Sequence, residues 1–97
     1  MEKILLNALK IYLSKKGNKI HNLKIKEEYA KAYFNGLKQW EIRKNDRDFK
    51  VGDIIEFNVI DKDIIYRREI IYLLEGGQFG IEKGYCILSL SGYEYIL

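Results

Sequence analysis

The sequence predicts an α+β fold in which a small, curled or barrel-like antiparallel sheet is accompanied by one internal helix and one N-terminal helix. Three observations support it: several short segments alternate polar and apolar residues, two segments have helical spacing instead, and turn-forming residues separate them. The chain has 97 residues and no proline, which favours a single core. Apolar residues make up 47% and charged residues 32% of the chain, so the composition excludes a disordered protein.

Residues 2–16 are expected to form an amphipathic helix with one narrow polar stripe. The stripe consists of Lys3, Asn7, Lys10 and Ser14. The broad apolar remainder needs a partner, which would be the body of the same domain, a second copy of the chain or a membrane surface. We therefore divide the chain into an N-terminal amphipathic helix extension over residues 1–17 and a folded domain over 18–97. A monomer or a homodimer through this helix is expected, and a protein-interaction role for the helix is one of three functional hypotheses.

The first strand and the internal helix follow. The segment "IHNLKI", residues 20–25, alternates polar and apolar residues as a half-buried strand does. The segment "KEEYAKAYFNG", residues 26–36, has helical spacing, acidic residues in its first turn and Gly36 as its stop. We interpret His21, at the start of the strand, as structural rather than catalytic.

A second strand is predicted for "KQWEIRK", residues 38–44. Its alternation gives an apolar face with Trp40 and Ile42 and a charged face with Glu41 and Arg43. Because apolar faces normally turn inward, Trp40 is expected in the core and not at a ligand site.

Three further strands complete the predicted sheet. They are "DIIEFNVI" at 53–60, "IIYRREIIYLL" at 64–74, as one long strand or two with a bulge, and "YCILSL" at 85–90. The loop between the last two, "EGGQFGIEKG" at 75–84, carries four glycines, which permit positive φ angles and close backbone approach. Cys86 lies between apolar strand residues and is expected to be a buried small hydrophobe.

Positive charge is concentrated in the first half of the chain. Residues 1–50 hold thirteen Lys and Arg against six Asp and Glu, whereas residues 51–97 hold four against eight. Clustered cations favour an anionic partner, because they displace the counterions of a phosphate backbone. This distribution of charge alone does not establish an anionic partner, since the two halves of a sequence need not be two halves of a structure.

Several classes of protein are excluded. One cysteine and one histidine provide neither a disulfide framework nor the usual zinc ligands, so we expect no metal or other cofactor and a reducing compartment. The apolar stretch near the N-terminus is interrupted by Asn7 and Lys10 and lacks the cleavage site of a signal peptide. No run approaches the roughly 18 apolar residues that span a bilayer. A cytoplasmic protein is expected.

The segment "GLKQWEIR" contains the pattern G-x-K-x-x-E-x-R, carried by Gly36, Lys38, Glu41 and Arg43. This pattern resembles the signature of the ASCH domains, a branch of the PUA-like fold. "NDRDFKVGDIIEF", "LLEGGQFGIEKGYCILSL" and the stretch His21 to Lys24 are similar to small bacterial and phage ASCH-type proteins. The resemblance covers residues 20–91. It implies a small PUA-like β-barrel with a cleft that binds RNA or a nucleotide-like ligand.

In the binding interpretation, the cleft is edged by the motif residues. Arg43 would clamp a phosphate or a base edge, Lys38 and Lys44 would act as point charges, and Glu41 would accept from an amino group of a base. Arg47 would extend the positive surface.

Base stacking is assigned to Tyr85 or Phe79. In the structural alternative, the three charged motif side chains form an ion-pair network with Asp46 or Asp48 that pins the turn. Exposed pairs of that kind contribute only about 0 to 1 kcal/mol each.

A hydrolase is the remaining alternative. Some ASCH relatives remove acetyl from N(4)-acetylcytidine, and in them the motif lysine is followed three residues later by threonine. Here Lys38 is followed by Glu41, which removes the hydroxyl. Activity would therefore require Glu41 to activate water, with Glu75 or Glu82 as the assisting acid.

Overall fold

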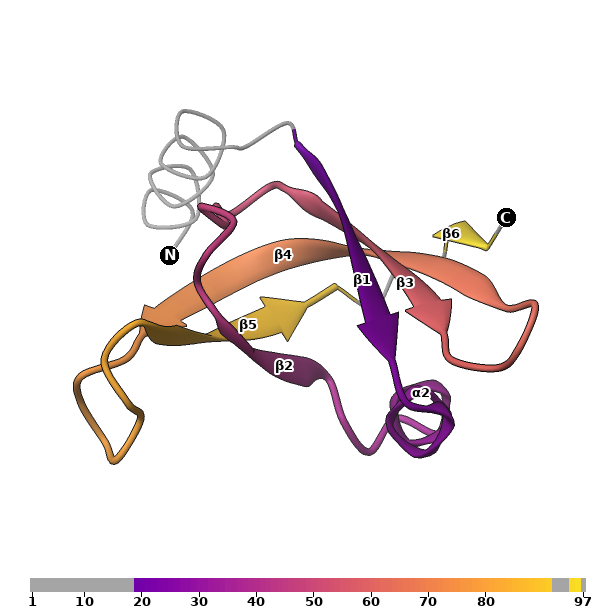
Figure 1. Ribbon diagram of the computed structural model, residues 1–97, viewed down its shortest axis with the longest axis horizontal. Helices are drawn as coiled ribbons and strands as arrows, with labels where there is room; N and C mark the ends of the chain where they lie inside the picture. Colours follow the sequence, from indigo (N-terminus) through magenta and orange to yellow (C-terminus); the bar gives the residue numbers. More distant parts are fainter. Residues whose placement is uncertain (1–18, 92–94, 97) are drawn as a thin grey trace, which may run out of the picture.

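The computed structural model describes residues 19–91 and 95–96 (Figure 1). In chain order the elements are β1 (Ile20–Ile25), α2 (Glu27–Phe34), β2 (Trp40–Lys44), β3 (Ile54–Val59), β4 (Ile65–Glu75), β5 (Tyr85–Leu90) and β6 (Tyr95–Ile96). The strand order in the sheet is β1-β3-β4-β5-β2, and β6 pairs with β4 beside this path. The five main strands curl into a half-barrel, as Figure 1 shows. This confirms a small barrel-like α+β fold, whereas the helix expected over residues 2–16 lies outside the described residues.

Alternating side chains place the core on the inner face of the curled sheet. In β3, Ile55, Phe57 and Val59 are buried, as their shared phase predicts, and Cys86 of β5 is buried too. The buried apolar residues form one cluster, which comprises Leu23, Ile25, Ala30, Tyr33, Phe49, Ile55, Phe57, Val59, Tyr66, Ile70, Cys86, Leu88 and Leu90.

The long strand β4 produces the curl. Its first part pairs with β3 and its second part pairs with β5, and the β4–β5 register shifts between Ile70 and Tyr72. A bulge of this kind bends a strand and increases its twist. Of the two predicted alternatives, one long strand or two strands with a bulge, the structure has the single long strand, and the bulge lies within it.

The expectation of a wholly antiparallel sheet is wrong at one pair. Strands β1 and β3 are parallel, with Ile20 opposite Ile54 and Ile25 opposite Val59. Parallel neighbours require a crossover of a dozen or more residues. The segment 26–53, which contains α2 and β2, supplies that crossover.

Helix α2 packs one narrow face on the core. Ala30 and Tyr33 are its buried residues, and the Tyr33 hydroxyl donates to the carbonyl of Ser91. The helix ends at Phe34, and Gly36 follows with φ +74°. Glycine adopts this left-handed conformation without a Cβ clash, so the predicted helix stop is confirmed. Tyr29, on another side of α2, stays 43% exposed.

One cation is part of the core. Arg68 is 1% exposed, and its guanidinium carbon lies 4.3 Å from the centroid of the Tyr33 ring and 5.2 Å from that of Tyr66. Its Nη1 donates to the carbonyl of Arg67 at 2.8 Å. Aromatic faces thus replace part of the solvation that burial removes from the guanidinium.

Within the described ranges 19–91 and 95–96, the structure has no helix with the length and apolar character that crossing a membrane requires.

Candidate functional site

The half-barrel leaves a seam between its two end strands, β1 and β2 (Figure 1). Since the other edge of β1 pairs with β3, backbone groups of β1 face this seam. Arg43 Nη2 donates to the carbonyl of Lys24 at 2.8 Å, and Arg47 Nη1 donates to that of Asn22 at 2.9 Å. One guanidinium group from β2 and one from the segment after it therefore bond to β1 where a strand ladder would otherwise lie.

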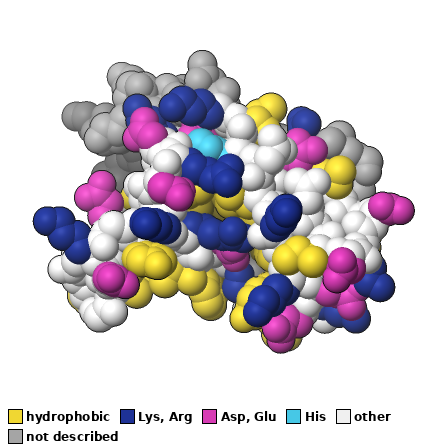
Figure 2. Space-filling model, viewed as in Figure 1, with side chains coloured by type: hydrophobic (Ala, Val, Ile, Leu, Met, Phe, Trp, Pro, Cys, Tyr) yellow, Lys and Arg dark blue, Asp and Glu magenta, His cyan; other side chains and the backbone are white. Residues whose placement is uncertain are grey.

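A hollow of about 460 Å³ opens at the α2 end of this seam. Its lining comes from β1, α2, β2 and residues next to these elements and to β3, and consists of Lys24, Ile25, Lys26, Tyr29, Lys38, Trp40, Glu41, Ile42, Arg43 and Ile60. We call it the main hollow. Figure 2 shows Lys and Arg side chains gathered across this face, with hydrophobic surface between them.

The three charged motif side chains converge on one wall of the main hollow. The Lys38 ammonium bonds to Oε1 of Glu41, and Arg43 Nε donates to Oε2 at 2.7 Å. Lys38 Nζ also donates to the carbonyl of Trp40 at 3.0 Å. Glu41 is only 6% exposed, so two cations hold its carboxylate in place.

The sequence left two arrangements of these side chains open, an ion-pair network or the edge of a cleft, and the structure has features of both. The motif side chains do form an ion-pair network, and they also line a hollow. The network does not include Asp48, which lies 3.8 Å from Lys19 Nζ and 3.6 Å from Lys50 Nζ instead. One net positive charge remains within the motif cluster.

The expected core position of Trp40 is wrong. The indole is 46% exposed and lines the main hollow. In the β2–β5 register, Glu41 lies opposite Leu88 and Arg43 opposite Cys86, and both of these β5 residues are fully buried. The charged face of β2 therefore turns inward, which is tolerated because β2 ends the sheet and its inner face opens into the hollow.

Two aromatic rings flank the Lys38 ammonium. Its Nζ lies 4.9 Å from the centroid of the Trp40 ring and 5.3 Å from that of Tyr29. These distances are within the range of cation–π attraction. The sequence does not predict either ring as part of the site, although Trp40 lies within the motif that carries Lys38, Glu41 and Arg43.

The main hollow carries an excess of positive charge. Among its described lining residues, four cations face one carboxylate, that of Glu41. The cations are Lys24, Lys26, Lys38 and Arg43. Aromatic surface and surplus positive charge together suit an anionic ligand that carries a flat ring.

A second hollow of about 170 Å³ lies farther along the seam. Its lining consists of Leu23, Arg43, Lys44, Asp46, Arg47 and Phe49. The predicted residues Lys44 and Arg47 therefore lie here and not in the main hollow, while Arg43 lines both.

The other predicted residues lie elsewhere. Tyr85 is opposite Lys44 in the β2–β5 ladder, Glu75 ends β4, and Glu82 belongs to the loop before β5. None of them is among the residues that line either hollow, and neither is Phe79. The structure thus brings Lys38, Glu41 and Arg43 together and leaves the proposed assisting acids apart from them.

Residues 20–90 match the family model described as "Domain of unknown function (DUF3850)". The chain belongs to this family. The comparison with curated proteins finds no match. Because the match runs from the start of β1 to the end of β5, both hollows lie within the DUF3850 domain.

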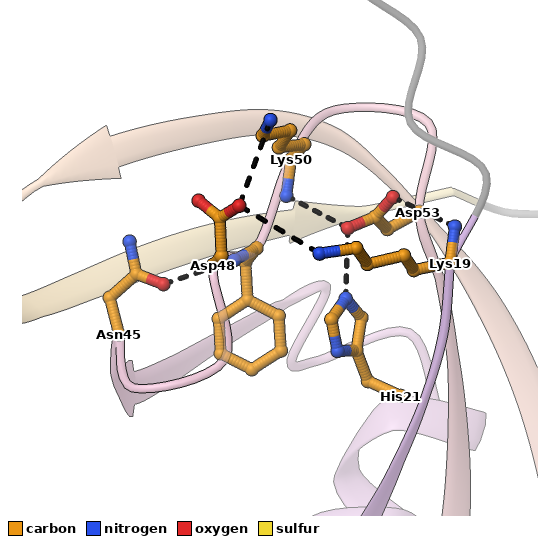
Figure 3. A network of polar contacts seen from close by, with 7 residues as sticks. Lys19, His21, Asn45, Asp48, Lys50 and Asp53 are labelled. Atoms are coloured by element: carbon orange, nitrogen blue, oxygen red, sulfur yellow. Dashed lines mark hydrogen bonds and ion pairs between the residues drawn. The ribbon is translucent and has the colours of Figure 1, made fainter.

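The DUF3850 domain also contains a polar network that the sequence did not predict (Figure 3). Asp53 is 1% exposed. Its carboxylate accepts the backbone N–H of Lys19 at 3.2 Å and of Lys50 at 3.0 Å, and Nε2 of His21 lies 2.8 Å from its Oδ2. The His21 ring meets the Phe49 ring edge-to-face, with centroids 4.7 Å apart. His21 therefore lies in a buried network that ties the segment after β2 to β1.

Proposed function

We propose that this DUF3850 domain binds a nucleotide unit, either in RNA or as a nucleotide-like small molecule, in the main hollow. The observation that carries the proposal is the Lys38 ammonium between the half-exposed rings of Tyr29 and Trp40. A base would stack on one of these rings, since base–aromatic stacking tolerates any base. A phosphate would meet the surplus cations of the lining.

Each charged residue of the motif has a role in the proposed binding. Arg43, already oriented by Glu41 and by the Lys24 carbonyl, presents a fixed guanidinium to a phosphate, because little side-chain freedom remains to be lost on binding. Glu41 holds Lys38 and Arg43 close together although both are cations. The resemblance of "GLKQWEIR" to the ASCH signature supports the same class of ligand, as a likeness of sequence.

The hydrolase alternative finds less support in the geometry. Both Glu41 oxygens are engaged, one by Lys38 and one by Arg43, so a water that Glu41 activates would have to compete with two cations. Among the described lining residues of the main hollow there is no second carboxylate and no Ser or Thr. Binding is therefore the function that we put forward, and deacetylation of acetylated cytidine is a reaction we expect the protein not to catalyse.

Trp40 provides a direct test, because it is the single tryptophan of the chain. We expect 5′-monophosphates of adenosine, cytidine and uridine, and short RNAs containing them, to change its fluorescence at low salt, with affinity that falls as salt rises. By calorimetry, Trp40→Leu and Arg43→Ala should each weaken binding about tenfold, the order expected for one base stack or one charged contact. Tyr72→Leu is the matched control, because Tyr72 is exposed and does not line the main hollow. Absence of binding at low salt, or equal affinity in all variants, would refute the proposal.

A further inference from the structure

The second hollow adjoins the main hollow along the seam. Arg43 belongs to both linings, and each lining takes neighbouring residues of β1, Leu23 in one and Lys24 in the other. The two hollows are therefore neighbours on the seam, with Arg43 between them.

The chemistry of the second hollow differs from that of the main hollow. At about 170 Å³ it has well under half the volume of the main hollow. Three cations line it, Arg43, Lys44 and Arg47, against one described carboxylate, Asp46. Two of the three carry guanidinium groups, whose fork geometry matches phosphate oxygens. The small volume and the cation excess suit a phosphate better than a second base.

The walls of the second hollow are fixed by the network around Asp53 (Figure 3). Phe49, one of the lining residues, is held by the His21 ring and by its own N–H, which donates to Oδ1 of Asn45 at 3.1 Å. The N–H of Asn45 in turn donates to the carbonyl of Gly84 at 2.8 Å. The segment that carries Arg47 is thus anchored on both sides, so the second hollow exists before any ligand binds.

We propose that the second hollow binds the next backbone phosphate of a single-stranded RNA whose base occupies the main hollow. This inference rests on the proposed function and narrows its ligand from a free nucleotide to a strand. A double helix does not suit the site, because paired bases cannot enter a hollow beside an aromatic ring without leaving the stack. Arg43 lies between the base and the phosphate, and Arg47 and Lys44 hold the phosphate from the far side.

The test compares ligand lengths and cation variants on the full chain. Hexanucleotides of adenylate, cytidylate and uridylate should bind at least about tenfold more tightly than the corresponding 5′-monophosphates, since they add phosphate contacts. Arg47→Ala should lower hexanucleotide affinity about tenfold, and should reduce the steepness of the salt dependence by about 0.7, the value for one phosphate contact on a single strand. At about 0.15 M salt the same substitution should leave monophosphate affinity within about twofold, because one exposed charge outside the main hollow is then largely screened.

Two further variants keep the result interpretable. Lys44→Ala removes another cation of the second hollow, at an exposed position. It should also lower hexanucleotide affinity, and it takes the place of Arg47→Ala in the test if that variant does not fold. Lys83→Ala removes one exposed positive charge from the loop before β5, outside both linings, and should leave both ligands unaffected.

Equal affinity of hexanucleotides and monophosphates, with Trp40-dependent binding of both, would overturn this inference while leaving the proposed function standing. Loss of hexanucleotide and monophosphate binding by the same factor in Arg47→Ala would overturn it too. If neither ligand binds, the proposed function and this inference fail together.

Discussion

Nε2 of His21 lies 2.8 Å from Oδ2 of Asp53, and both side chains are buried although they are 32 residues apart in the chain. This contact joins the start of β1 to the turn before β3. Asp53 is placed for it by Gly52, whose φ of +94° lets the chain reverse. The buried carboxylate thus serves as a common acceptor for the start of β1 and the turn before β3, where the parallel ladder of these two strands begins with Ile20 opposite Ile54.

Asp53→Ala should lower the free energy of unfolding by about 2 to 4 kcal/mol, because it leaves two backbone N–H groups and the His21 ring without their acceptor. Urea unfolding followed by circular dichroism measures the change. Asp63→Ala is the control, since Asp63 is exposed in the turn between β3 and β4, and it should change stability by less than about 0.5 kcal/mol. A similar small effect for both variants would show that the network does not stabilise the fold.

Cys86 should be unreactive in the folded protein. Burial raises the pKa of its thiol, and the Glu75 carboxylate adds to the shift, so less of the reactive thiolate is present at pH 8. The residue is also fully buried. Because it is the one cysteine of the chain, the reaction with a chromogenic disulfide reports on it alone. We expect a rate at least about tenfold slower in buffer than in urea, and equal rates would contradict the buried position.

The sequence predicts those features of the fold that depend on local patterns. Strands β1 and β5 begin and end where the alternation of "IHNLKI" and "YCILSL" places them, and Gly36 ends the helix as expected. Each of these signals is contained within a few neighbouring residues, so no knowledge of distant contacts is needed.

The features that the sequence does not predict depend on which strands are neighbours and on which strands end the sheet. The alternation of Trp40 and Glu41 correctly predicts a strand with two unlike faces. Which face turns inward is decided by the neighbouring strand and by the open seam. The same is true of Asp53, which in "FKVGD" looks like an ordinary turn residue. Its acceptor role exists only because β1 and β3 are parallel neighbours.

Tyr66 should make stability fall at alkaline pH. Burial raises the pKa of its hydroxyl above the ordinary value of 10.0, and the charge of Glu41 adds to the shift. The folded state therefore keeps this proton more strongly than the unfolded state. The resulting stabilisation is fully present below pH 10 and is lost as pH rises through the folded-state pKa.

Comparison with Tyr66→Phe isolates this effect from the titration of lysines. The variant should show a shallower decline of unfolding free energy between pH 10 and 11.5. At pH 7 it should differ by less than about 1 kcal/mol, because the hydroxyl has no hydrogen-bond partner among the described residues. If the free energy of unfolding declined equally steeply with pH in both proteins, Tyr66 would not be the source of the alkaline loss of stability.

Glu41→Gln should lower the stability of the domain and raise the affinity of the main hollow for its ligand. Glutamine keeps the shape of the side chain but removes the charge that holds Lys38 and Arg43 together, so the free energy of unfolding should fall by about 1 to 3 kcal/mol. The same change raises the positive charge of the hollow, and affinity for uridine 5′-monophosphate at low salt should rise about two- to fivefold. Glu28→Gln, an exposed substitution on α2 outside the lining, controls for net charge and should alter neither quantity. If the free energy of unfolding of Glu41→Gln equalled that of the unchanged protein, the role of the carboxylate as a support for the two cations would be disproved.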